Sequence, residues 1–366
     1  MNKAFFINGG AGRVLCSIPA LERYAETHED FVIVSESWHE LYLNSPTIRD
    51  KVFPMGHKDL FEDHLKDKKI VSPEPYRVNE YFNQKCNLIQ AFDIEINELE
   101  ETPKTRELKL EINKEDQING HNIISEVKQT LGKDKIIVFQ PFGQSAKSEG
   151  NFIYDSSGRS FEVANIMSLI EKLNKNYGIV LMTQLELPGW QNLGVASPKG
   201  MGLNGWAGVI NAADYFLGCD SVGQHFAHAM EKPATVVIGS TFPENISYPE
   251  NKKFTVIDNG KSKRKYSPIR VTMDICGDRD NEDLMILNDS TVDSIVKSIK
   301  DKIGISKKSN KDIGISPIPS NKTPVFGSNA KPALAPSTAT PINLGGSKKK
   351  KKKPIEELLE IESKKS

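Results

Sequence analysis

Short apolar runs alternate with longer amphipathic stretches along the first 305 residues of the chain. Apolar runs bounded by turn residues predict buried strands, here at 3–7, 31–34, 52–53, 135–139, 179–182, 215–217 and 235–238. Helical spacing of apolar residues predicts helices at 14–27, 36–43, 77–92, 115–131, 161–174, 206–213 and 222–230, and a short extended segment is expected at 108–112. Strands and helices that alternate in this way build parallel sheets covered on both faces, so an α/β fold is predicted.

The alternation falls into two series, which meet near residues 131–135. We therefore expect two doubly wound, Rossmann-like domains, at 1–133 and 134–305, that face one another across a cleft. Ligands of such folds bind at the carboxyl ends of the strands.

The pattern changes at residue 306. Residues 306–366 are rich in Lys, Pro and Ser and include six consecutive lysines, Lys348–Lys353. Such a segment buries too little apolar surface to offset its ordering entropy, so a disordered tail is predicted. Two interpretations remain open for it: a solvated tail, or a segment that docks a polyanion or a protein partner.

Composition and charge narrow the class of protein. With 366 residues, 38% of them hydrophobic, the chain is expected to be globular, and no apolar run approaches the length of a membrane span. The tail from residue 306 carries a net charge of +8 and the first 305 residues carry −8, so no overall charge for binding nucleic acid is present. Four widely spaced cysteines and the lack of a signal peptide favour a reducing cytoplasm.

A glycine-rich loop follows the first predicted strand. Its residues 8–13, NGGAGR, contain Gly10 and Gly12, which would let a ligand approach the backbone at the start of a helix. The spacing is not GxGxxG, so a tight structural turn explains the loop equally well.

A second loop-to-helix junction carries most of the candidate chemistry. Asp220 and Ser221 follow a strand, and Ser221 with Gln224 has the spacing of a capping box. Gly223 would keep the helix N-terminus open for a diphosphate. His225 and His228 share one side of this helix, where one histidine is expected to reach a ligand and the other to pack in the core. A third metal ligand is missing from the pattern, so we expect no metal ion.

Two basic residues lie in loops that follow the predicted strand at 135–139. Lys147 and Arg159 could each meet a phosphate, although a lone basic residue on a loop is more often only solvated.

With these residues in view, the chain resembles glycosyltransferase family nine, the heptosyltransferase-like enzymes, over residues 3–303. Residues 12–21, GRVLCSIPAL, are similar to the family pattern G-D-V-L-x-x-x-P-A-L, and SPTIRDKVF at 45–53 is similar to its h-P-x-V-x-x-V pattern. Residues 220–229, DSVGQHFAHA, followed by Pro233 and GSTFP at 239–243, resemble D-[ST]-G-x-x-H-x-x-A-A and G-x-T-x-P, with one extra residue before the Gln-His pair.

The resemblance implies a GT-B fold and inverting transfer from a nucleotide-sugar donor, without a metal ion or cofactor. The 1–133 domain would take the acceptor and the 134–305 domain the donor. Lys147 or Arg159 would supply the diphosphate cation, and Ser221, Gly223, Gln224 and His225 would cradle the leaving phosphate. The base and ribose would lie near Trp206. The acceptor would be a hydroxyl of a glycan, of a lipopolysaccharide-type sugar or of a modified nucleic-acid base.

One position departs from the family pattern. Arg13 stands where the family has the Asp of its G-D pair, and an arginine cannot accept a proton at neutral pH. The catalytic base is therefore unknown, and Glu36, after the second strand, is a weak candidate for it. Arg13 could instead bind a phosphate or an acidic acceptor. The alternative function is a non-catalytic GT-B-shaped binding or scaffold protein that docks its partner through the basic tail.

Overall fold

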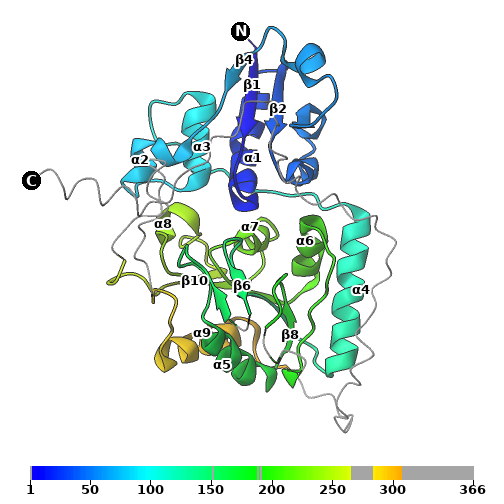
Figure 1. Ribbon diagram of the computed structural model, residues 1–366, viewed down its shortest axis with the longest axis vertical. Coiled ribbons are helices and arrows are strands. Elements are labelled where there is room, and N and C mark those ends of the chain that lie inside the picture. Colours follow the sequence, from blue (N-terminus) through cyan, green and yellow to red (C-terminus); the bar gives the residue numbers. More distant parts are fainter. Residues whose placement is uncertain (1, 151, 188, 190–191, 265–282, 307–366) are drawn as a thin grey trace, which may run out of the picture. The chain divides into compact units, whose positions relative to one another are not determined.

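The computed structural model describes residues 2–150, 152–187, 189, 192–264 and 283–306. The described residues all belong to one compact unit, Met1–Asn329. Two separate parallel sheets organise this part of the chain (Figure 1). We refer to residues 2–113 as the N-terminal half and to residues 114–306 as the C-terminal half.

The sheet of the N-terminal half has the strand order β3-β2-β1-β4. All three of its pairings are parallel, and β1 faces β2 with Lys3 opposite Phe31 and Ile7 opposite Ser35. The central strands are short, uninterrupted apolar runs because both of their faces are buried. The strands are β1 (Lys3–Ile7), β2 (Phe31–Ser35), β3 (Val52–Pro54) and β4 (Lys69–Val71).

Helices α1 (Ala11–Ala25) and α3 (Leu88–Asn97) pack against one another in the core of this half. On the opposite face of the sheet, Val32 and Val34 pack with Leu60 and Leu65. The remaining elements are short: the 3-10 helices η1 (His39–Asn44), η2 (Arg49–Lys51) and η4 (Pro75–Arg77), the π-helical turn η3 (Phe61–Leu65) and the α-helical turn α2 (Asn79–Phe82).

The sheet of the C-terminal half has the strand order β11-β10-β9-β5-β8, again with parallel pairings. A separate antiparallel hairpin, β6–β7, lies in the loop after β5. The strands are β5 (Ile136–Gln140), β6 (Lys147–Glu149), β7 (Phe152–Tyr154), β8 (Gly178–Leu181), β9 (Tyr215–Cys219), β10 (Ala234–Ile238) and β11 (Phe254–Asp258).

Alternate residues of the central strand β5 enter two different apolar clusters. Ile137 and Phe139 pack with α5 and α9, whereas Ile136 and Val138 pack with α6 and α7. The sheet is therefore covered on both faces, with α5 and α9 below it and α6 and α7 above it in Figure 1. The helices are α4 (Lys114–Leu131), α5 (Val163–Asn174), α6 (Leu203–Ala212), α7 (Val222–Ala229), α8 (Pro243–Ile246) and α9 (Asp289–Ile303).

Two glycines bring α4 and α6 into direct backbone contact. A Cβ atom on Gly120 would lie 2.3 Å from the carbonyl carbon and oxygen of Gly208, and one on Gly208 would lie 2.1 Å from the carbonyl oxygen of Asp116. No side chain fits at either position, so α4 lies directly on α6 of the C-terminal half. The expected domain boundary at 133/134 remains a prediction, and this contact favours placing it before Lys114.

The predicted α/β fold with parallel sheets is confirmed, but two predicted helices were wrong. In place of the helix predicted at 36–43, the structure has the 3-10 helix η1 at His39–Asn44. The predicted helix at 77–92 is broken into α2 and α3, because Gln84 has a left-handed φ of 60° and Asn87 begins a new helix in a capping box with Gln90. The extended segment at 108–112 pairs with no strand among the described residues.

The described chain ends one residue beyond the predicted start of the tail. Ser306 is buried and its hydroxyl donates a hydrogen bond to Asp134 at the start of the five-stranded sheet. The predicted disorder of the tail and the partner of Lys348–Lys353 fall outside the described residues. Within them, no helix is long and apolar enough to cross a membrane. Cys16, Cys86 and Cys219 are buried free thiols, and Cys276 is outside the described ranges.

Candidate functional site

The carboxyl ends of β5, β9 and β10 bring three loops together in the C-terminal half. The loop after β5 packs against the loop after β10, since the Ser240 hydroxyl donates to the carbonyl of Ser157 (2.6 Å) and a Cβ on Gly239 would lie 2.5 Å from the carbonyl oxygen of Gly158. This edge of the sheet is where ligands of parallel α/β folds bind.

Arg159 is the cation at the centre of this edge. Its Nε donates to Ser157 Oγ (3.0 Å) and its Nη2 to Ser145 Oγ (3.2 Å), while Nη1 lies 4.0 Å from Asp220 Oδ2. Burial acts to lower the pKa of Arg159, but the negative charges of Asp220 and Asp155 outweigh it and the net shift is upward. The guanidinium stays charged, and its side chain is 29% exposed, so it can meet an anion from solvent.

Asp155 fixes the loop that carries Arg159. One carboxylate oxygen accepts bonds from the backbone and hydroxyl of Ser157, and the other accepts bonds from the backbone and hydroxyl of Ser160. The Ser160 hydroxyl also accepts the N–H of Gly143 (2.9 Å). These short-range bonds hold the loop in one conformation and orient the arginine.

Asp220, at the end of β9, is 6% exposed. Burial raises the pKa of its carboxyl, and the nearby Arg159 partly opposes the rise. Its Oδ1 accepts a hydrogen bond from the side-chain amide of Gln224 (3.0 Å). Asp220 thus contacts both Gln224 of α7 and the guanidinium of Arg159, which fixes them relative to the end of β9.

The N-terminus of α7 is closed by a side chain that the sequence analysis did not single out. Gln140 Oε1 accepts the N–H of Gly223 (2.9 Å), and Gln140 Nε2 donates to Ser221 Oγ (3.0 Å). The predicted capping box is therefore absent here: the Ser221 side chain makes no cap bond to α7, and Gln224 turns to Asp220. An anion would have to displace Gln140 to reach the Gly223 N–H.

Packing alone is enough to require a glycine at position 223. A Cβ at this position would lie 2.4 Å from Gln140 Oε1 and 2.6 Å from the ring of Phe216. The expected role of Gly223 in phosphate binding stays a prediction.

The two histidines of α7 enclose one tyrosine. A hydrogen bond joins His225 Nδ1 to the Tyr248 hydroxyl (2.7 Å), and the His228 ring stacks on the Tyr248 ring with centroids 3.6 Å apart. Burial lowers the pKa of His225 to about 3 and that of His228 to about 4, so both rings are neutral at physiological pH. The structure shows both histidines packed against protein, and contact of either with a ligand stays a prediction.

The glycine-rich loop of the N-terminal half faces the candidate site. A Cβ on Gly10 would lie 3.2 Å from Gln144 Oε1, and one on Gly12 would lie 2.9 Å from the His225 ring. Gly9, with a φ of +93°, turns the chain into α1. The loop at 8–13 therefore borders the loop after β5 and the start of α7.

Arg13 is buried among protein groups of the N-terminal half. It is 8% exposed, donates to Glu74 Oε1 (3.0 Å) and to the carbonyl of Pro73 (2.8 Å), and lies over the rings of Tyr76 and Phe92. Its charge is paired with Glu74 in this structure, and the expectation that Arg13 binds a phosphate or an acidic acceptor stays a prediction. The arginine instead places the carboxylate of Glu74 beside the glycine-rich loop, although the two residues are 61 positions apart in the sequence.

The remaining predicted residues lie in different surroundings. Glu36 is exposed, and its backbone N–H is bonded to Ile7 at the end of β1, so it lies at the carboxyl edge of the N-terminal sheet. Lys147 is exposed at the start of the β6–β7 hairpin. Trp206 is 6% exposed and packs in the core, so its proposed contact with the nucleotide remains a prediction.

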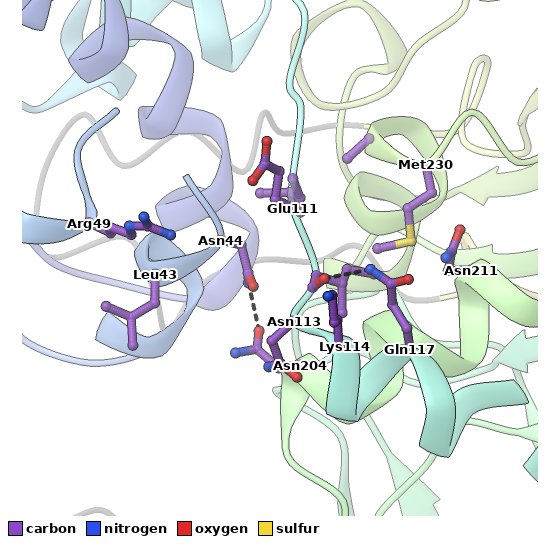
Figure 2. A pocket seen from close by; sticks show the side chains of 13 residues that line it. Leu43, Asn44, Arg49, Glu111, Asn113, Lys114, Gln117, Asn204, Asn211 and Met230 are labelled. Atoms are coloured by element: carbon purple, nitrogen blue, oxygen red, sulfur yellow. Dashed lines mark hydrogen bonds between the residues drawn. The ribbon is translucent and has the colours of Figure 1, made fainter. Parts of the chain in front are cut away.

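A cavity of about 780 Å³ lies at the other end of α7, away from Ser221. Its walls come from η1 and η2, from residues 110–117, from α6 and from the end of α7 (Figure 2). Asn44 donates to Asn204 Oδ1 (2.8 Å) across one side of it. Because five carboxamide side chains line it, we call it the amide-lined cavity: Asn44, Asn113, Gln117, Asn204 and Asn211.

No group of three or more His, Cys, Asp or Glu side chains that could hold a metal ion occurs in the part of the chain that the structure describes. Two guanidinium groups lie at the carboxyl edge of the five-stranded sheet in the described chain: Arg159, which is partly exposed, and Arg264, which is buried against Asp258 and the Gly239 carbonyl.

Two parallel α/β halves with strand ends and loops facing each other define a GT-B fold of the heptosyltransferase-like kind seen in glycosyltransferase family nine. Solved structures carry this conclusion. A family 9 glycosyl transferase from Veillonella parvula matches with a TM-score of 0.57 at 13% identity, over 81% of this chain and 97% of its own. The ADP-heptose lps heptosyltransferase II of E. coli matches with a TM-score of 0.50 at 13% identity, over 70% and 90% of the two chains.

A third similar structure is the bacterial iron-containing dodecameric glycosyltransferase TibC from enterotoxigenic E. coli, with a TM-score of 0.51 at 11% identity, over 83% of this chain and 78% of its own. No protein-family profile and no curated protein matches the sequence. The resemblance drawn from the sequence motifs is thus confirmed at the level of the fold.

Proposed function

We propose that the chain is an inverting glycosyltransferase that moves a sugar from a nucleotide-sugar donor to a hydroxyl acceptor without a metal ion. The observation that carries this proposal is the position of Arg159. A charged, partly exposed guanidinium lies at the carboxyl ends of β5 and β9, held by Ser145 and Ser157, in a fold shared with heptosyltransferases. A fixed cation at this edge can neutralise a leaving diphosphate.

The donor would bind to the C-terminal half. Arg159 would contact the diphosphate, and Lys147 would reach it from the exposed start of the β6–β7 hairpin. When the diphosphate displaces Gln140, the N–H of Gly223 becomes available at the positive end of α7. The acceptor would approach from the glycine-rich loop of the N-terminal half, which supports the proposed division of labour between the halves.

The transfer needs a group that accepts the proton of the attacking hydroxyl. In the proposed reaction, the acceptor oxygen bonds to the anomeric carbon, the bond from that carbon to the diphosphate breaks, and a carboxylate takes the proton. Glu74 suits this role better than Glu36, because its contact with Arg13 (3.0 Å) orients its carboxylate beside the glycine-rich loop. Glu36 is exposed to solvent and makes no ion pair among the described residues.

One observation favours a second function, that of a non-catalytic binding protein of GT-B shape. Gln140 already hydrogen-bonds to the N–H of Gly223 and to the Ser221 hydroxyl, and Arg13 is paired with Glu74. A site closed by its own side chains would suit a protein that kept the fold and lost the reaction. The two functions differ in whether a nucleotide sugar is bound and turned over.

The test is a thermal-shift screen of the full chain against ADP-, UDP-, GDP- and CMP-sugars with a chelator present. A ligand at about 100 times its Kd stabilises a protein by about 2.7 kcal/mol, which is easily detected. We expect one nucleotide class to raise the Tm, the shift to decrease in Arg159→Ala, and the same donor to be consumed when an acceptor is added.

Arg106→Ala is the matched control, because Arg106 pairs with Glu26 on the surface of the N-terminal half. It should retain the donor shift. An unchanged Tm with every nucleotide sugar at millimolar concentration would contradict the proposal that the protein binds such a donor. Binding without turnover, with any acceptor class tried, would favour the binding protein.

A further inference from the structure

The amide-lined cavity has no part in the proposed transfer. It is lined by Ala229 and Met230, at the last turn of α7, whereas the donor would bind at Ser221 and Gly223 in the first turn. Eight helical residues separate these ends by about 12 Å. Between them, Gly12 of α1 packs against the ring of His225, so the two sites lie on opposite sides of a protein contact.

The size of the cavity suits a small organic ligand. Ligand pockets commonly enclose about 300–1,000 Å³, and this cavity measures about 780 Å³. Four of its polar side chains make no hydrogen bond or ion pair with other described residues: Arg49, Glu111, Lys114 and Asn211. Figure 2 shows Arg49 on the η1–η2 side, Asn211 on the α6 side, and Lys114 below the segment that carries Glu111.

The chemistry of the lining selects among ligand classes. None of the residues that line the cavity is aromatic, so a nucleobase would find no ring on which to stack. Two cations with one carboxylate leave a net charge of +1, which suits a single negative charge and is too little for a polyanion. Carboxamides present a donor and an acceptor side by side, as pairs of sugar hydroxyl groups require.

The apolar residues that line the cavity also suit a sugar. Leu43, Leu110, Ile112 and Met230 contribute aliphatic surface, against which the C–H face of a sugar ring can pack. Asn44 and Asn204 are held by their mutual bond, and Asn204 Nδ2 also donates to the Glu40 carbonyl (3.2 Å). Part of the amide array is therefore already fixed in position.

We propose that the amide-lined cavity is a second binding site, for a saccharide that carries one negative charge. Arg49 and Lys114 meet the anionic group, Asn211 and the fixed Asn44–Asn204 pair bind hydroxyl groups, and Met230 packs against the ring. The site goes beyond the proposed transfer and does not depend on it, because binding here requires no nucleotide.

Calorimetric titration of the full-length protein tests the proposal with three sugars and with inorganic phosphate. Glucose 6-phosphate and glucuronic acid carry a charge on a sugar, from a phosphate and a carboxylate respectively, and glucose is the neutral match. We expect at least one charged sugar to bind and glucose to bind at least tenfold more weakly. Whether the phosphate or the carboxylate binds more tightly identifies the source of the charge.

Variants then locate the site. Arg49→Gln and Lys114→Gln alter exposed side chains, so both should fold, and each should weaken the charged sugar at least fivefold. Asn211→Leu should weaken glucose and the charged sugar alike, because it removes hydroxyl contacts only. Lys104→Gln, an exposed lysine outside the lining, is the matched control and should have no effect.

Three results would overturn the proposal: no heat of binding from either charged sugar at 10 mM, equal binding of inorganic phosphate alone, or unchanged binding in all three cavity variants. Arg159→Ala separates this site from the donor site. It should reduce the nucleotide-sugar shift and leave binding of the charged sugar intact.

Discussion

Gly12 and His225 meet so closely that no larger residue fits at position 12. A Cβ atom there would lie 2.9 Å from both Cδ2 and Nε2 of the His225 ring. Gly12 is in the first turn of α1 and His225 is in α7, so this contact joins the N-terminal half to the C-terminal half. The glycine at this position serves packing between helices, and its expected role in the approach of a ligand stays a prediction.

Gly12→Ala should destabilise the protein. Alanine in a helix gains about 0.5–1 kcal/mol over glycine, whereas overpacking a core costs about 1–3 kcal/mol. His225 is 5% exposed and bonded to Tyr248, so its ring cannot move aside and the steric cost prevails. We expect a net loss of about 1–2 kcal/mol in urea unfolding.

The control for that substitution is Gly56→Ala, because a Cβ on Gly56 would meet nothing within 4 Å. This variant should unfold within about 0.5 kcal/mol of the original chain. If Gly12→Ala proves as stable as the control, the contact with His225 is not as tight as the structure shows.

Stability should fall on acidification below pH 6.5. Burial lowers the pKa of His225 to about 3 and of His228 to about 4, so the folded protein binds these protons far less readily than the unfolded chain. The free energy of unfolding therefore rises with pH between the folded and unfolded pKa values, by up to about 1.4 kcal/mol per pH unit for each histidine.

His225→Gln and His228→Gln test this origin, since each removes one titrating ring. The slope of unfolding free energy against pH between 4.5 and 6 should decrease in both variants. His121→Gln, on the exposed side of α4, is the matched control and should keep the original slope. Parallel curves for all variants would assign the acid sensitivity to other groups.

Arg159→Ala should weaken the nucleotide-sugar donor about 10- to 100-fold, the value of a hydrogen bond to a charged group. Arg159→Lys keeps the charge but loses the planar guanidinium whose N–H groups bond to Ser145 and Ser157. We therefore expect the lysine to retain only part of the affinity for the donor. Titration of the donor into each variant measures the effect. An unchanged Kd in Arg159→Ala would place the diphosphate elsewhere.

Glu74→Gln should lower the transfer rate about 10²- to 10⁴-fold if Glu74 accepts the proton. Its donor affinity should not change, because Glu74 belongs to the N-terminal half. The substitution also leaves Arg13 without its ionic partner, so unfolding measurements must accompany the kinetics. Glu36→Gln is the comparison: a greater loss of kcat there than in Glu74→Gln would restore Glu36 as the catalytic base.

Gly120→Ala should be more damaging than Gly12→Ala. Its Cβ would overlap the backbone of Gly208 at 2.3 Å, and a backbone cannot rotate away as a side chain can. We expect a loss of about 3 kcal/mol or more in urea unfolding. Gly205→Ala, also in α6, would make only an ordinary contact at 3.6 Å and should be tolerated.

The sequence predicted the fold well because apolar periodicity reports burial directly. Strands β1, β2, β5, β8, β9 and β10 were all located, since each is an apolar run flanked by turns. The helices predicted at 36–43 and 77–92 were wrong, because helical spacing of apolar residues does not show where a helix breaks. The signal for the second break was present in Asn87 and Gln90, which form a capping box.

The candidate site was less predictable, because its key contacts join distant residues. Arg159 and Asp220 were singled out and lie close together, as strand ends in one sheet must. Gln140 and Glu74 were missed. Each acts through a partner more than 60 positions away, Gly223 and Arg13 respectively, and neither stands in a local pattern that marks such a contact.

The backbone contact between Gly120 and Gly208 also determines where the protein can bend. Because α4 packs directly on α6, the described segment that could serve as a hinge between the halves is residues 99–113, which form neither helix nor strand. That hinge is restrained at Glu111, whose N–H donates to the Asn44 carbonyl (2.8 Å). Residues 110–113 of this segment also line the amide-lined cavity. A saccharide bound there would therefore contact the hinge and would either hold the two halves apart or hold them together.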